Sequence, residues 1–255
     1  MNANQTRTPS GSIFNILGAL AMGLILAEPA KAVPFAWDPS AAGLAGASAF
    51  SGDALKATEV SHIQFTSAVD WNEHGFAKIT GIENGGVGST PAGLNSTYTL
   101  YFDFSGTGDF STGTFTTATM TLYGVNGVST FGIDANNNAY VDNGTNTAIA
   151  LATASLISGT TGGAPGGDLF ADIWTTFTAT PAGSAVFLAP SLPRVIYGHF
   201  FHPIDEPGGI TLVSDGIVLV GGVDTLAFVP EPFSPLLLIG GLPGMWLFRR
   251  RAARV

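Results

Sequence analysis

The chain has 255 residues, of which 45% are hydrophobic, and its nine Lys and Arg against eighteen Asp and Glu give a formal net charge of −9. So acidic a chain does not suit a nucleic acid as partner, because phosphates are bound by basic patches. The absence of cysteine excludes thiol catalysis, cysteine-based zinc sites and disulfide bonds.

Residues 1–32 show the order of segments found in a secretory signal peptide. A polar start is followed by an apolar stretch from Ile13 to Ala27, and Ala30 and Ala32 supply the small residues of a cleavage site. The apolar stretch is shorter than the ~20 residues of a membrane-spanning helix. We therefore predict a signal helix that is removed by cleavage after Ala32, which leaves Val33 as the N-terminus of an exported protein.

Residues 33–229 have the pattern of a β protein. Up to Lys56 the chain is rich in Ala, Gly and Ser, and we expect an irregular lead-in whose Phe35 and Trp37 dock on the remainder. Runs of β-branched and aromatic residues between Gly- and Pro-containing turns then predict short strands. These are Thr58–Phe65, Gly75–Ile82, Leu169–Thr180, Val186–Leu188, Arg194–Phe201, Ile210–Val213, Ile217–Val220 and Thr225–Val229, while Ala148–Ser158 fits either a strand or a short helix.

The segment Asn95–Tyr123 carries the clearest alternation of apolar and polar residues. From Tyr98 to Phe104 every second side chain is apolar, which predicts a strand with one buried face. We expect Ser105–Asp109 to form a turn and Thr114–Tyr123 to be the partner strand, with a bulge near Phe115. Many short strands with few helical patterns predict an all-β fold, namely an antiparallel, jelly-roll-like β-sandwich at residues 33–229.

An Asn-rich loop offers the best metal-site candidate. The spacing of Asp134, Asn136, Asn138 and Asp142 is one by which a calcium loop surrounds a hard cation with oxygen ligands. The loop lacks the Gly and the bidentate Glu of a strong calcium site. An Asn-rich hairpin turn without metal is therefore the alternative, and calcium is the one cofactor considered.

No catalytic residue is predicted. His199 and His202 are three residues apart, so on a strand they point to opposite faces, and we interpret them as surface or edge histidines. The chain has no Gly-x-Ser-x-Gly motif and no phosphate-binding loop. Four aromatic side chains would stack on sugars if they are exposed, although burial in the core is the alternative: Trp37, Trp71, Trp174 and Tyr140.

The C-terminal segment 230–255 consists of three blocks. Pro230-Glu231-Pro232 is expected to stay extended, because proline fixes φ and has no amide hydrogen. Phe233–Phe248 is apolar, and we expect it to form a short hydrophobic helix that is marginal as a membrane span. The end is basic and would be retained on the cytoplasmic side of the membrane, through Arg249, Arg250, Arg251 and Arg254.

This order of blocks resembles the PEP-CTERM sorting signal of Gram-negative bacteria. The resemblance implies that an exosortase in the membrane recognises the segment and cuts near Pro230-Glu231-Pro232. The body would then be delivered to the cell surface or the extracellular matrix after a transient stay in the inner membrane. A plain C-terminal anchor is the alternative.

Three further stretches look like segments of the flocculation-associated PEP-CTERM proteins: Phe35–Gly43, Gly93–Tyr98 with Leu100–Phe102, and Leu151–Gly159. That resemblance implies a non-enzymatic surface or matrix protein that takes part in aggregation with exopolysaccharide. A carbohydrate-binding module is the first alternative and a secreted hydrolase the second. Residues 33–232 keep three Lys and Arg against seventeen Asp and Glu, a formal charge of −14, and no nucleic acid partner is expected.

Overall fold

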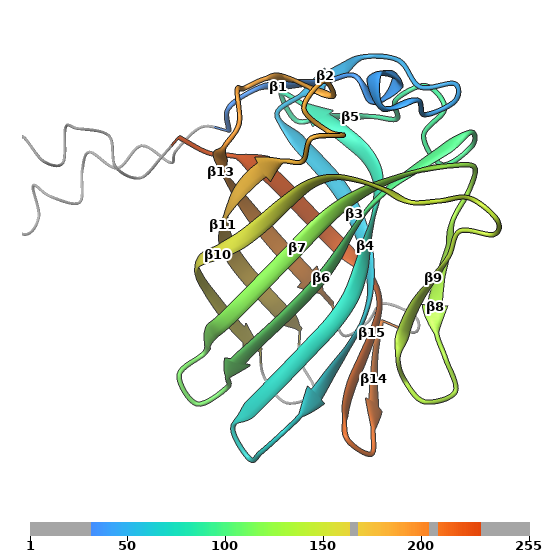
Figure 1. Cartoon of the computed structure of the whole chain (residues 1–255). Coiled ribbons are helices and arrows are strands. Elements are labelled where there is room, and N and C mark those ends of the chain that lie inside the picture. Colours follow the sequence, from blue (N-terminus) through green and yellow to red (C-terminus); the bar gives the residue numbers. More distant parts are fainter. Residues whose placement is uncertain (1–31, 164–167, 204–208, 231–255) are drawn as a thin grey trace, which may run out of the picture. The chain divides into compact units, whose positions relative to one another are not determined.

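A computed structural model of the chain describes residues 32–163, 168–203 and 209–230 (Figure 1). Ala32 and Pro230 are therefore the outermost of the described residues. The two predicted terminal helices, Ala30, Glu231, Pro232 and the four terminal arginines lie outside this part of the chain. The described part holds no apolar helix of membrane-spanning length.

Eight antiparallel strands form a closed barrel in which each strand pairs with the next barrel strand along the chain. The last strand also pairs with the first, which closes the sheet. In chain order they are β3 (Ala54–Phe65), β4 (Asp70–Asn84), β6 (Tyr98–Asp109), β7 (Thr114–Asn126), β10 (Ile149–Gly163), β11 (Leu169–Ala179), β13 (Arg194–His202) and β15 (Gly216–Phe228).

The all-β class is thus confirmed, whereas the predicted sandwich with jelly-roll-like topology is wrong. Period-two alternation is the same in a sandwich and in a barrel, because both bury one face of each strand. What separates them is the pairing of β15 with both β13 and β3, which are far apart in the sequence. A strand pattern contains no information on such long-range pairing.

Short elements complete the molecule at the barrel ends and outside it. β1 (Phe35–Trp37), β2 (Phe50–Gly52) and β12 (Phe187–Ala189) form a small sheet, with a 3-10 turn at Pro39–Ala42, and in Figure 1 β1 and β2 lie at the upper end of the barrel. The lead-in predicted to be irregular therefore contains strands, although its docking is confirmed. β5 (Val87–Ser89) pairs with β4, β14 (Ile210–Val213) pairs with β15, and β8 (Thr130–Ile133) forms a hairpin with β9 (Ala139–Asp142).

Two hydrophobic clusters hold these parts together. The larger lies inside the barrel near β1, where Phe35 and Trp37 pack with Phe177, Phe187 and Phe228. The smaller lies on the outer face, where Val60, Phe76 and Tyr101 pack beneath the β8–β9 hairpin. The barrel is therefore packed tightly at one end and covered on one side.

The structure corrects the predicted turn at Ser105–Asp109, which is the end of strand β6. The outward hydroxyl groups of Ser105 and Thr107 bond to Thr119 and Thr117 across the sheet, at 3.0 and 2.8 Å. Glycine at position 108 serves close packing, since a Cβ there would lie 2.4 Å from the Trp71 ring. The actual turn spans residues 110–113, and the bulge predicted near Phe115 is confirmed by a register shift opposite Thr107 and Gly108.

Candidate functional site: a cavity inside the barrel

The barrel interior contains a cavity of about 640 Å³ in the half that carries the β3–β4, β6–β7 and β14–β15 hairpins, drawn at the bottom of Figure 1. This volume lies within the range of about 300–1,000 Å³ that is usual for small-molecule sites. The exposed side chains of Phe65, Phe110 and Leu212 line it toward the hairpins. Its walls are mainly apolar and include Trp71, Phe104, Phe115, Met120, Ile173 and Phe200.

The sequence leaves room for this cavity by a change in the size of the inward residues. On β6 the inward positions are the large Leu100, Phe102 and Phe104 and then Gly106 and Gly108. A barrel of eight strands is just wide enough to be filled by side chains or to hold one small ligand. Gly106 and Gly108 have no side chain to fill the interior, so space for a small ligand remains in this half of the barrel.

Five polar side chains project into the barrel beside this apolar space, and we call them the interior polar cluster: Glu59 and Ser61 of β3, Glu73 of β4, His202 of β13 and Asp224 of β15. Four of them are at most 5% exposed. Glu73 is only partly buried, but it lines the cavity, so its exposed surface faces the cavity. Buried carboxylates cost free energy unless they are paired, which makes this cluster the least expected feature of the interior.

The side chains of the cluster are joined by short contacts. Glu59 Oε1 lies 2.9 Å from His202 Nε2, and Ser61 Oγ lies 3.1 Å from Glu59 Oε1 and 2.8 Å from Glu73 Oε1. Burial, and next the charge of Glu59, raise the pKa of Glu73 to about 8. The Ser61 hydroxyl has a single hydrogen, so it can donate to only one of the two carboxyl groups. Both contacts are hydrogen bonds when Ser61 donates to Glu59 and a protonated Glu73 carboxyl donates to Ser61. The cluster then holds a proton near neutral pH.

A β-bulge turns Asp224 toward this cluster. Gly221 pairs with Glu59 and Asp224 with Ala57, so three steps on β15 match two on β3. Without the extra residue Asp224 would point outward, because a shift of one residue exchanges the two faces of a strand. Gly222 supports the bulge with a φ of +81°, a conformation that glycine adopts readily.

The structure places the predicted calcium residues in and beside the β8–β9 hairpin. Asp134 Oδ1 accepts hydrogen bonds from the amides of Asn136 and Asn138, at 2.8 and 2.9 Å, and these bonds lower the pKa of Asp134. Asp142 is not part of this turn, since it pairs with Thr130 at the other end of β9 and accepts from the amide of Gly144. Asp134 and Asn138 are thus brought together as a hairpin turn, whereas Asp142 is not.

The two histidines of β13 point to opposite faces, as predicted, but His202 is not a surface residue. It is 2% exposed and contacts Glu59 inside the barrel. His199 lies outside, where its Nδ1 is 2.8 Å from Asp172 Oδ1 and Tyr197 donates a hydrogen bond to the same oxygen. Desolvation and this bond to Asp172 raise the pKa of Tyr197 to about 12.

The aromatic residues considered for sugar stacking are divided between the interior and the surface. Trp37 and Trp71 are 1% and 3% exposed, whereas Tyr140 is exposed on β9. Trp174 is half-buried on the outside, with its ring centroid 4.9 Å from that of Tyr197. Cross-strand pairing extends this contact into what we call the outer aromatic face, made of the pairs Phe170–Phe201, Asp172–His199 and Trp174–Tyr197.

Comparison with protein-family models, with curated proteins and with solved structures found no match for this chain.

Proposed function

We propose that this protein is an exported β-barrel that binds an apolar small molecule in its interior cavity, as a binding rather than a catalytic protein. The observation that carries the proposal is the mainly apolar cavity of about 640 Å³. Apolar surface transferred from water to such a cavity contributes ~25 cal/mol per Å², so a ligand of fitting shape gains several kcal/mol from burial alone.

The cavity also limits the chemistry of the ligand. The acidic side chains of Glu59 and Glu73 line it, and they disfavour an anionic head group such as a carboxylate. A neutral or cationic group can donate hydrogen bonds to them. Apolar walls give a polysaccharide chain few hydrogen-bonding partners, so we do not propose that the cavity hydrolyses glycans.

A neutral fluorescent probe tests this proposal. N-phenyl-1-naphthylamine is expected to bind with a dissociation constant in the micromolar range and to quench Trp71, which lines the cavity. Ala118 also lines the cavity, and Ala118→Phe places a ring in that space, so binding is expected to weaken at least about tenfold.

The matched control is Val87→Phe, which adds the same ring at a side chain that is 70% exposed on β5. Its affinity for the probe should equal that of the parent protein. Equal affinity of Ala118→Phe and the parent would show that the probe binds elsewhere, and the proposed site would be wrong.

A second role, carbohydrate binding, is favoured by the outer aromatic face. Sugar rings stack on aromatic side chains while neighbouring polar groups bond to their hydroxyls. On this face Phe170 is 39% exposed, and Asp172 and His199 lie between the two aromatic pairs. This combination supports the alternative of a carbohydrate-binding surface and, with the C-terminal signal, an association with exopolysaccharide.

Trp174→Ala tests this surface in sedimentation assays with a panel of insoluble polysaccharides. We expect it to lower affinity about tenfold, which corresponds to ~1.4 kcal/mol of lost stacking. Leu188→Ala, which removes an exposed apolar side chain on β12, serves as the control and should leave binding unchanged. Binding that is lost equally in both variants would argue against the outer aromatic face.

The proposed location of the protein is the cell surface or the extracellular matrix, reached through a signal peptide and an exosortase. The support is the sequence of the two ends, namely Ala30 and Ala32 before the body and Pro230-Glu231-Pro232 with the terminal arginines after it. Participation in flocculation is part of the same proposal.

A further inference from the structure

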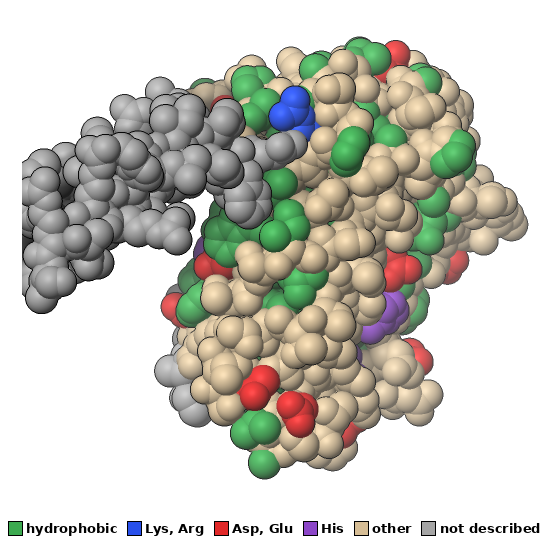
Figure 2. Space-filling model, turned by 60° about the vertical axis from the view of Figure 1, so that its left-hand side comes forward, with side chains coloured by type: hydrophobic (Ala, Val, Ile, Leu, Met, Phe, Trp, Pro, Cys, Tyr) green, Lys and Arg blue, Asp and Glu red, His purple; other side chains and the backbone are tan. Residues whose placement is uncertain are grey.

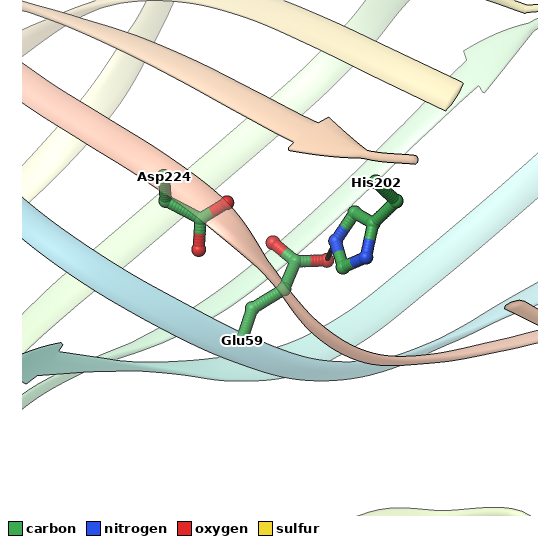
Figure 3. Close-up of side chains that lie close together, drawn as sticks. All are labelled: Glu59, His202 and Asp224. Atoms are coloured by element: carbon green, nitrogen blue, oxygen red, sulfur yellow. Dashed lines mark ion pairs between the residues drawn. The ribbon is translucent and has the colours of Figure 1, made fainter. Parts of the chain in front are cut away.

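We propose that Glu59, His202 and Asp224 bind a divalent transition-metal ion, with Zn²⁺ as the expected occupant. One ligand atom from each of the three side chains can be chosen so that all lie within 4.8 Å of one another. Figure 3 shows the Glu59 carboxylate between the imidazole of His202 and the carboxylate of Asp224. The three side chains come from three strands, β3, β13 and β15, so the barrel wall itself brings them together.

This buried site holds more acidic than basic side chains. Glu59 and Asp224 are 5% and 0% exposed, and His202 can supply at most one positive charge. Among the described residues, the three basic side chains are engaged elsewhere. Lys56 pairs with Glu83, Lys78 lies over the Phe131 ring, and Arg194 donates to the carbonyl of Ser191. Burial of two charged carboxylates costs free energy, and a divalent cation would neutralise both at once.

The ligand set selects the type of metal. An imidazole nitrogen with two carboxylate oxygens suits zinc and its neighbours in the transition series, whereas Ca²⁺ takes six to eight oxygen ligands. Two ligand atoms about 2.1 Å from one tetrahedral ion lie ~3.4 Å apart. The 2.9 Å between Glu59 Oε1 and His202 Nε2 is the distance of a hydrogen bond, so these two atoms must separate by about 0.5 Å when the ion replaces the shared proton.

Three protein ligands leave one position of a tetrahedral zinc ion open. Glu59 and His202 both line the cavity, so the open position would face the cavity. An oxygen or nitrogen atom of a bound molecule could fill this position. The metal site does not depend on the proposed apolar ligand, because its three ligands come from the chain alone.

Local backbone structure around the site is specialised in a way that supports this role. The bulge in β15 points Asp224 inward, and bulges are common next to functional sites, where they re-aim a side chain. At Gly222 a Cβ would lie 2.6 Å from His202 Cε1, so a side chain at this position would displace the imidazole. Gly222 thus allows the imidazole to approach the backbone of the strand that carries Asp224.

Metal binding is tested on the purified full-length protein after treatment with a chelator. Isothermal titration with Zn²⁺ is expected to give one ion per chain with a dissociation constant in the micromolar range or tighter. Co²⁺ at the same site should give the intense visible absorption of a four-coordinate complex. His202→Ala and Asp224→Asn are each expected to weaken Zn²⁺ binding at least about tenfold, because each removes one of three ligands.

The matched control is His199→Ala, which removes an outward imidazole from the same strand. It should bind Zn²⁺ as the parent does. Asp224→Asn keeps the shape of the side chain, so it reports on the site even if His202→Ala fails to fold. Absence of zinc binding by the folded parent would mean that protons alone neutralise the cluster. Unchanged affinity in Asp224→Asn would place the ion elsewhere, and either result would overturn the proposal.

Discussion

Replacing Trp37 by Ala is expected to lower the free energy of unfolding by ~3–5 kcal/mol, as is usual for a buried Trp or Phe reduced to Ala. Trp37 is 1% exposed, and its ring lies 5.2 Å from that of Phe35 and 5.1 Å from that of Phe187. It also packs on Phe177 and Phe228 inside the barrel. The substitution would therefore leave a cavity where the β1–β2–β12 sheet meets the barrel.

Urea unfolding followed by circular dichroism measures this loss. Leu188→Ala on β12 is the control, because Leu188 is 59% exposed and its removal should change stability by less than about 0.5 kcal/mol. Trp37→Phe should cost less than Trp37→Ala, since it keeps a ring in place. It also removes a buried indole N–H that has no hydrogen-bond partner among the described residues. A loss below 1 kcal/mol for Trp37→Ala would contradict the packing of this end.

The end of the barrel near Trp37 and the end that contains the cavity contribute differently to stability and to binding. Large inward side chains near Trp37 supply stability, while Gly106 and Gly108 give up packing and leave space. A protein that needs a cavity must obtain its stability elsewhere, since each missing side chain costs contacts. In this barrel the aromatic cluster around Trp37 supplies that stability.

The strands could be predicted from the sequence because their pattern is local. Alternation from Tyr98 to Phe104 identifies the buried face of β6, and Leu100 and Phe102 are indeed at most 1% exposed. The turn at Ser105–Asp109 was predicted wrongly, because glycine occurs both in turns and at strand positions where another group packs closely. The two cases look alike in a sequence. Only the position of Trp71, more than thirty residues earlier, shows that Gly108 serves packing.

The interior polar cluster could not be predicted for related reasons. Its members come from four strands between Glu59 and Asp224, and only the closed pairing of the barrel brings them together. One local signal was present, since Glu59 and Ser61 alternate in phase with the buried Leu55. The same rule fails for Asp224, because the bulge at Gly221 changes the face to which it points. Alternation therefore identifies a buried carboxylate on a regular strand but not beyond a bulge.

The largest effect on the fate of the protein is expected from changes in the proposed sorting segment 230–255. The barrel is complete between Val33 and Val229, where the Val33 amide donates to the Phe228 carbonyl and the Val229 amide donates to the Val195 carbonyl. Pro230 follows directly, and proline favours an extended peptide that an enzyme can bind. Cleavage after Ala32 and near Pro230 would therefore remove none of the eight barrel strands.

Replacing Pro230-Glu231-Pro232 by three alanines should nearly abolish delivery to the surface, with uncut precursor accumulating in the membrane fraction. The apolar run Phe233–Phe248 and the arginines after it remain, so the protein is held while the recognition motif is lost. Cell fractionation with immunoblotting measures both the size and the location of the product. The comparison variant replaces Arg249, Arg250, Arg251 and Arg254, which should weaken retention and release uncut protein into the periplasm or the medium. The first variant is thus expected to be retained in the membrane and the second to be released. A triple-alanine protein that matures and reaches the surface like the parent would show that the segment is a plain anchor.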